Sequence, residues 1–183
     1  MTVPGPADRG SPILDHAGIL SDDAEDSLRT PIEALKDDLG FEIVVMTVPG
    51  FDGVIGDFSQ EVSHEWGLGG EAELFVLMLL VEDRRRFEFH VGYGAGRAVG
   101  QGWLTEVRSE QMVPHFAAGN FGQALLAGVT AIDEQVRAND DKLRHEPPPR
   151  QGPPGGPPPI VWVGLFLVAA ACGAGGWKLY AGR

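Results

Sequence analysis

The chain has 183 residues and a formal net charge of −12 at neutral pH, a length that suits one domain with a sizeable hydrophobic core. All 26 acidic residues lie in residues 1–146, whereas three of the 14 basic ones (Arg150, Lys178 and Arg183) lie outside, so this part has a formal charge of −15. Such a charge repels phosphate backbones and excludes nucleic acid as a partner. It favours cations or basic protein surfaces instead.

The first predicted element is a helix between Ser21 and Gly40. Ser21 is a favourable N-cap, Gly40 is a favourable helix end, and apolar residues repeat every three or four positions between them. Pro31 lies inside this segment, so we expect it to kink the helix or to separate its first turn from the rest.

Three strands are predicted next. Residues 41–48 (FEIVVMTV) and 74–81 (LFVLMLLV) are apolar runs, the second as expected of a central strand covered on both faces. Residues 57–66 between them predict a short helix, and residues 82–85 predict a turn into the alternating strand 86–91. A strand–helix–strand order favours a parallel pair, and a hairpin adds an antiparallel neighbour.

Two helices complete the predicted domain, over residues 103–115 and 121–136, after a glycine-rich segment. The apolar stripe of the second helix is expected to cover the sheet. The predicted fold class is therefore α/β, a small mixed β-sheet (a parallel pair plus an antiparallel hairpin strand) sandwiched by helices.

The C-terminal part predicts a membrane anchor. Residues 160–180 (IVWVGLFLVAAACGAGGWKLY) have no charge before Lys178, and about 20 apolar residues cross a bilayer core. Residues 147–159 (PPPRQGPPGGPPP) predict a semi-rigid extended linker. The alternative for residues 160–180 is a buried core helix. The alternative for residues 147–159 is a proline-rich ligand for an aromatic-lined groove of another protein. The expected organisation is a tail (1–11), the domain (12–146), the linker, a single transmembrane helix and a short tail (181–183).

The side of the membrane depends on the N-terminus. Residues 1–18 lack the apolar stretch of an export signal, so the chain is expected to be tail-anchored in membrane lipid with a cytoplasmic domain. A removed signal sequence would instead place the domain on the exported side, periplasmic or lumenal.

Small residues recur on the predicted membrane helix. Ala169 and Gly173, and likewise Ala171 and Gly175, are four positions apart, which lets another helix approach closely in lipid. These residues predict contact with a larger membrane protein complex or self-association. The alternative is that small residues are simply tolerated there.

Several short motifs follow one another in a set order and resemble the TPM domain family, the small α/β domain of thylakoid-lumen and bacterial membrane-tethered proteins. The resemblance covers about residues 12–139, and the membrane helix after a Pro/Gly-rich linker is also similar to the family's layout. The motifs are ILDHAGILS (13–21), the strand ending in TV (47–48), EVSHEWGLG (61–69), EDR (82–84), GYG (92–94) and PHFAAGNF (114–121).

The resemblance implies a membrane-tethered domain that serves a membrane complex. Members of the family include acid phosphatases, proteins that bind calcium or magnesium, plant proteins that act in photosystem II repair, and an animal branch that modulates a membrane receptor. The typical member carries an N-terminal export signal, whereas residues 1–18 do not resemble one.

The resemblance also implies a metal site. Asp15 and Asp83 match acidic positions of the family and Glu82 replaces a third, so the three carboxylates are candidate ligands for Ca²⁺ or Mg²⁺. The alternative is that Asp15 caps a turn and Asp83 belongs to a hairpin turn. The acids that usually follow the GYG motif are absent, with Ala95-Gly96 and Gln101 in their region, which should weaken any cation site.

Arg84, Arg85 and Arg86 form a basic run in an acidic domain. They are candidate contacts for a phosphate or an acidic partner, or a solvated hairpin tip. Together these features predict an accessory, assembly or maintenance subunit of a larger membrane complex, such as a respiratory or photosynthetic one, bound through its membrane helix and acidic domain. The alternative is a membrane-tethered, divalent-metal-dependent acid phosphatase whose catalytic residues the sequence leaves unassigned.

Overall fold

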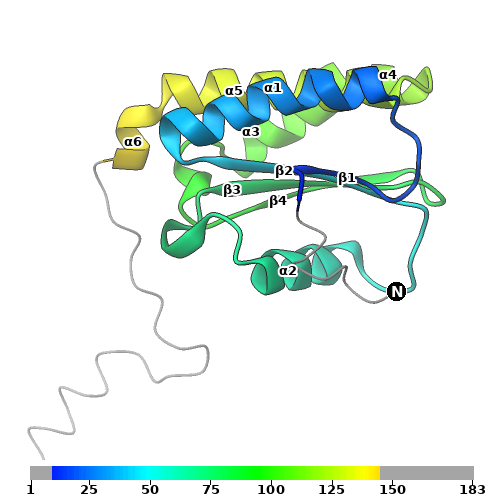
Figure 1. The fold of residues 1–183 in the computed structure, drawn as a ribbon, viewed down its shortest axis with the longest axis horizontal. Helices are drawn as coiled ribbons and strands as arrows, with labels where there is room; N and C mark the ends of the chain where they lie inside the picture. The colour runs from blue at the N-terminus through cyan, green and yellow to red at the C-terminus, as the bar shows by residue number, and fades with distance from the viewer. Residues whose placement is uncertain (1–9, 145–183) are drawn as a thin grey trace, which may run out of the picture. The chain divides into compact units, whose positions relative to one another are not determined.

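A computed structural model describes residues 10–144, which form a four-stranded mixed sheet in the order β1-β2-β3-β4 (Figure 1). β1 pairs parallel with β2, β2 parallel with β3, and β3 antiparallel with β4. The mixed α/β class, the parallel pair and the hairpin strand are thus confirmed. The strands are β1 (Ile13–Asp15), β2 (Glu42–Val48), β3 (Phe75–Val81) and β4 (Arg86–Val91).

β1 was not predicted. It has three residues, with Ile13 opposite Val45 and Asp15 opposite Thr47. Three residues are too few to show a strand period, so only pairing with β2 makes this segment a strand.

Helices cover both faces of the sheet (Figure 1). One face carries α1, α3, α4 and α5, and the opposite face carries α2. The predicted helix 103–115 is two helices joined by a π-helical turn over Val107–Met112. The helices are α1 (Asp22–Leu39), α2 (Ile55–Trp66), α3 (Gln101–Glu106), α4 (Val113–Ala117), α5 (Phe121–Ala138) and α6 (Asp140–Arg144), with 3₁₀ turns at Gly70–Ala72 and Ala95–Arg97.

α1 has the predicted ends. The Ser21 side chain accepts a hydrogen bond from the Ala24 N–H, and the N–H of Gly40, at φ 66°, donates to the Lys36 carbonyl. α1 runs unbroken through Pro31, so the expected separation of its first turn was wrong. Buried Leu28 and Ile32 hold the helix on the sheet on both sides of the proline.

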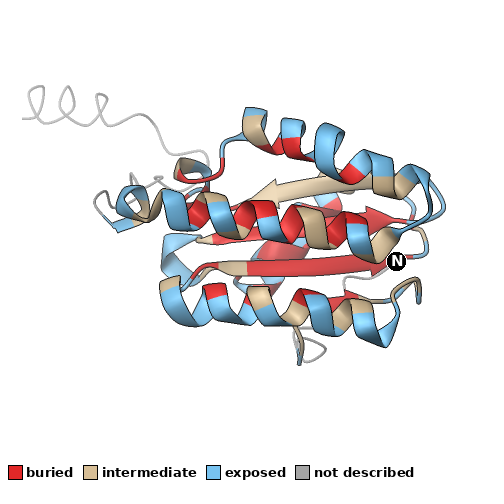
Figure 2. Ribbon diagram, turned by 90° about the horizontal axis from the view of Figure 1, so that it is seen from above, coloured by how far each residue is buried: buried red, intermediate tan, exposed pale blue. Residues whose placement is uncertain are grey.

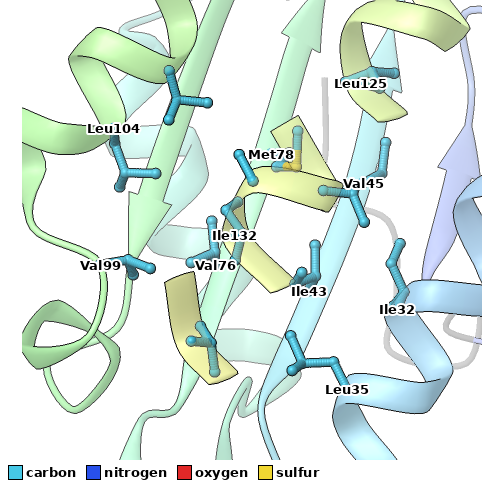
Figure 3. Close-up of a cluster of buried hydrophobic side chains, with 14 of the residues drawn as sticks. Ile32, Leu35, Ile43, Val45, Val76, Met78, Val99, Leu104, Leu125 and Ile132 are labelled. Carbon is cyan, nitrogen blue, oxygen red and sulfur yellow. The ribbon is translucent and has the colours of Figure 1, made fainter. Parts of the chain in front are cut away.

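Alternate residues of β2 and β3 enter two separate cores. One core lies under α2, where Phe58, Val62 and Trp66 are buried. The other lies under α1 and α5 (Figure 3). All seven residues of β3 are buried, which confirms a central strand covered on both faces. The second core includes Ile32, Leu35, Ile43, Val45, Val76, Met78, Val99, Leu104, Leu125 and Ile132.

No helix within residues 10–144 is long and apolar enough to cross a membrane. The predicted membrane helix (160–180), its linker (147–159) and the small-residue positions Ala169, Ala171, Gly173 and Gly175 lie outside the described residues. The expected domain boundaries stay predictions.

Candidate functional site

The carboxyl ends of the three parallel strands lie at one end of the sheet, together with the turn between β3 and β4 (Figure 1). Ligand sites of open α/β sheets usually lie at this carboxyl end. All three predicted metal ligands are found there: Asp15 at the end of β1, and Glu82 and Asp83 just after β3.

Asp15 fastens the loop between β1 and α1. One carboxylate oxygen accepts a hydrogen bond from the Leu20 N–H at 2.8 Å, and the other accepts one from the Thr47 hydroxyl. The Thr47 hydroxyl is buried and also accepts from the Ala17 N–H at 3.2 Å. Asp15 therefore carries out the structural role that the sequence left open, holding a turn.

Glu82 and Asp83 lie in the exposed hairpin turn. Their N–H groups donate to the carbonyls of Val48 and Pro49, both at 3.0 Å, which fixes the turn beside the end of β2. The Asp83 carboxylate lies against the backbone of Gly50, since a Cβ built there would be 2.4 Å from an Asp83 oxygen. A glycine at position 50 thus leaves space for this carboxylate.

The basic run divides into two kinds of residue. Arg84 donates to the carbonyls of Phe51 at 2.8 Å and Gly53 at 3.0 Å, and its guanidinium lies 5.6 Å from the Phe51 ring centre. Arg84 therefore holds the loop after β2. Arg85 and Arg86 are exposed and make no ion pair within residues 10–144.

The described residues contain no ready cluster of ligands for Ca²⁺ or Mg²⁺. Hard cations take six or more oxygen ligands, usually with several carboxylates. Within residues 10–144, no group of three or more His, Cys, Asp or Glu side chains is arranged to hold a metal ion. Asp15 already accepts two hydrogen bonds. The three-carboxylate site stays a prediction that this geometry does not support.

A hollow of about 930 Å³ lies beside the hairpin turn. Phe87, Phe116 and Phe121 give it an aromatic lining. The ring centre of Phe116 lies 5.5 Å from that of Phe87 and 6.2 Å from that of Phe121. Arg108, from the π-helical turn, also lines it. The sequence did not predict this hollow. Phe116 and Phe121, in the PHFAAGNF motif, were the available indication, but phenylalanines at such positions are equally expected of core residues.

Two residues of β4 have shifted pKa values. Burial raises the pKa of Glu88, although the charges of Arg86 and Arg108 and a hydrogen bond with Ser59 oppose the shift. Burial lowers the pKa of His90, whose Nε2 lies 3.2 Å from the Ser63 hydroxyl. Both shifts disfavour the charged form, as expected beside an apolar layer.

Comparisons with known proteins agree with this geometry. Residues 13–135 match the family model of the TPM domain. The structure is similar to the N-terminal domain of a protein from P. gingivalis, with a TM-score of 0.68 and 29% identity over 80% of this chain and 99% of that one. A search of the curated proteins found no match.

Two further solved structures share the fold alone. One is the N-terminal domain of the cg2496 protein from Corynebacterium glutamicum, with a TM-score of 0.54 and 14% identity over 69% of this chain and 80% of that one. The other is the BA42 protein from the psychrophilic bacterium Bizionia argentinensis, with a TM-score of 0.57 and 19% identity over 65% and 82%.

Proposed function

The chain belongs to the TPM domain family, and from this premise we propose that it is a membrane-anchored accessory, assembly or maintenance subunit of a larger membrane protein complex. In this proposal residues 160–180 cross the membrane and pack against the complex. The acidic domain, held near the membrane by the linker, contacts a basic surface of a partner subunit.

The exposed side of α1 is the observation that supports a basic partner most directly. Arg29 lies near Glu25 and Asp26, Lys36 pairs with Glu42 at 2.9 Å, and Arg137 pairs with Asp38 at 2.8 Å. Within residues 10–144, no ion pair involves Asp22, Asp23, Glu33 or Asp37. A surface of one sign attracts a complementary surface and speeds association at low salt. The exposed carboxylates of α1 belong to Asp22, Asp23, Asp26, Glu33, Asp37 and Asp38.

The predicted membrane helix supplies the second contact. Small residues occupy positions 169, 171, 173 and 175; on the proposed helix they would lie on adjacent turns, and such surfaces let helices pack closely in lipid. A helix that only anchors a domain does not need them.

Mild solubilisation of the membrane and isolation of the full chain test this proposal. We expect the chain to migrate in a larger assembly, and Gly173→Ile to reduce that assembly by bulking the small-residue surface. Leu167→Ile, which conserves side-chain volume, is the matched control. A chain that always migrates alone, with or without Gly173→Ile, would contradict the proposal.

A second candidate function is a divalent-dependent phosphatase. It is favoured by one observation: the exposed Asp83 carboxylate lies close to the backbone of Gly50 at the carboxyl end of the sheet. The full chain in detergent should then hydrolyse phosphomonoesters when calcium or magnesium is added, and Asp83→Ala should abolish the rate. Glu71→Gln, at an exposed position away from the carboxyl end of the sheet, is the control. Equal rates for the wild type and Asp83→Ala would remove this candidate.

A further inference from the structure

β4 is an edge strand with one open side. It pairs with β3 only, and Figure 2 shows it as intermediate in burial, whereas β3 is buried throughout. The Gly92 N–H donates to the Phe75 carbonyl at 2.9 Å. Because backbone groups alternate in direction along an antiparallel pair, those of Phe87, Phe89 and Val91 point away from β3.

Three adjoining hollows follow this open side from one end to the other. They measure about 930, 420 and 370 Å³. The first and second share Arg108, and the second and third share Val91 and Gln101. We call the three together the edge groove. Its lining includes every residue of β4, a strand of about 20 Å for six residues at the usual rise per residue.

The wall of the edge groove is the backbone edge of β4. The middle hollow is lined by four consecutive residues, 88–91. Side chains of consecutive strand residues point to opposite faces, so a surface that touches all four runs along the strand edge. The opposite wall comes from α3 and the π-helical turn, through Gln101, Thr105 and Arg108. An extended polypeptide placed there would meet unpaired backbone groups of β4.

Arginines concentrate along the edge groove, although the domain is strongly acidic. Arg85, Arg86, Arg97 and Arg108 line it, and none of them has an ion pair within residues 10–144. Within the described residues, a terminal nitrogen of Arg97 is buried and has no hydrogen-bond partner. Such a group calls for an acceptor, since an unpaired buried donor is costly.

Carboxylates also line the edge groove, and they define where an acidic ligand fits. Glu82 and Asp83 lie only at the hairpin end, beside the aromatic hollow. Glu88 also lines the middle hollow, but its carboxylate lies on the α2 side, near Gly56 and Ser59. The end near Arg97 has no carboxylate in its lining. An apolar side chain therefore suits the hairpin end, and acidic side chains suit the stretch from Arg108 to Arg97.

We propose that the edge groove binds an extended, acidic segment of a partner polypeptide as a fifth strand beside β4. Strand addition to an open sheet edge takes its affinity from backbone hydrogen bonds and its specificity from side-chain hollows. A large apolar side chain of the segment packs on Phe87 and Phe116, and its carboxylates bind Arg108 and Arg97. The inference rests on residues 10–144 alone and does not require the proposed function.

Two other occupants fit the edge groove less well. The chain's own linker, residues 147–159, contains eight prolines, which have no N–H to donate to a strand. A second copy would bring together two domains that each carry a formal charge of −15 over residues 1–146, and like charge opposes that pairing. A partner segment with the opposite sign to the arginines meets neither obstacle.

Peptide binding to the full chain in detergent micelles tests the proposal. The probe is a fluorescein-labelled peptide of eight residues with phenylalanine at one end, glutamate at every second position after it, and valine between them. The phenylalanine and the glutamates then share one face of the added strand. Binding is read by fluorescence anisotropy. We expect saturable binding that weakens about tenfold in Arg108→Gln, the loss of one charge-assisted contact. Arg29→Gln, near β1 at the other edge of the sheet, should bind like the wild type.

Two altered peptides and one further measurement separate strand addition from plain charge attraction. A peptide with lysine in place of glutamate, and one with methylated backbone nitrogens at alternate positions, should both lose binding. On binding the original peptide, the N–H groups of Phe87, Phe89 and Val91 should exchange with solvent more slowly. Circular dichroism should confirm that Arg108→Gln stays folded.

The proposal would be overturned by equal binding of the glutamate and lysine peptides, by unchanged affinity in folded Arg108→Gln, or by protection of amides away from β4. Protection of the same three amides in the free protein, together with a dimeric mass, would overturn it in favour of pairing between two copies.

Discussion

The two edges of the sheet differ in how their polar groups are used. At the β1 edge, the Asp15 carboxylate is engaged by Thr47 and by the Leu20 N–H. At the β4 edge, arginines lie along an open groove, and a buried nitrogen of Arg97 has no hydrogen-bond partner among residues 10–144. Polar groups that satisfy one another stabilise a fold, whereas unsatisfied ones beside a hollow indicate a binding surface. The comparison therefore assigns structure to β1 and recognition to β4.

Gly92→Ala is expected to have the largest effect, because it disturbs the end of the β4 edge. A Cβ at position 92 would lie 2.1 Å from the Glu73 carbonyl oxygen, so the backbone must move. We expect a loss of about 3 kcal/mol in the free energy of unfolding, the upper range for overpacking, measured by urea denaturation. Gly96→Ala is the matched control, because nothing lies within 4 Å of its Cβ. Equal stability of the two variants would show that β4 is not fixed at this glycine.

Asp15→Ala tests the assignment of the β1 edge. The change removes two hydrogen bonds and leaves the buried Thr47 hydroxyl without this partner, so the free energy of unfolding should fall by about 2 kcal/mol. Asp83→Ala, at an exposed turn, should change it by less than about 0.5 kcal/mol. Equal losses would instead favour a shared metal site. So would stabilisation of the wild type by calcium in urea denaturation that is lost in both Asp15→Ala and Asp83→Ala.

The sequence predicts the central part of this fold well because its signals are long. The apolar run of β3, the alternation of β4 and the two ends of α1 each extend over several residues or depend on strong local chemistry. β1 escaped prediction because three residues carry no period, and the π-helical turn escaped because its backbone departs from helical spacing by a single residue.

The candidate site is less predictable for a different reason. Asp15 and Asp83 share a motif set, but only the pairing of β1 with β2 places Thr47 against Asp15. The three arginines of the hairpin look alike in sequence, yet Arg84 is held by two carbonyls and a phenylalanine ring while its neighbours are not. Arg97 and Arg108 join them only through the packing of α3 beside β4. Such convergence depends on tertiary contacts that local patterns do not encode.

The pH dependence of stability that His90 contributes measures how far β4 is shielded from solvent. Burial lowers the pKa of His90 from its usual 6.5, so the native state binds a proton more weakly than the unfolded chain. The contribution of this residue to stability is then present above about pH 6.5 and is lost as the pH falls through the lower native pKa. His90→Gln should remove this dependence from urea denaturation curves. In NMR titrations, His90 should titrate at lower pH in the native protein than in urea. A higher native value would contradict a desolvated edge.

Glu88→Gln is expected to have the smallest effect, and it connects stability at the β4 edge with binding. Burial raises the pKa of Glu88 above its usual 4.5, so ionisation costs the native state more than the unfolded chain. The stability that the protonated form provides is present below about pH 4.5 and decreases as the pH rises through the higher native pKa.

Glu88→Gln cannot ionise, so its urea midpoint should exceed that of the wild type slightly at about pH 7 and equal it at about pH 3, where the wild-type residue is neutral too. The same change removes a negative charge close to the edge groove, so the glutamate peptide should bind slightly more tightly at about pH 7. If stability rises but peptide affinity does not, the carboxylate opposes folding without facing the ligand, and the bound segment must lie nearer to Arg97. If neither changes, solvent screens Glu88 at this half-exposed edge, and the contrast between the two edges would then rest on the arginines alone.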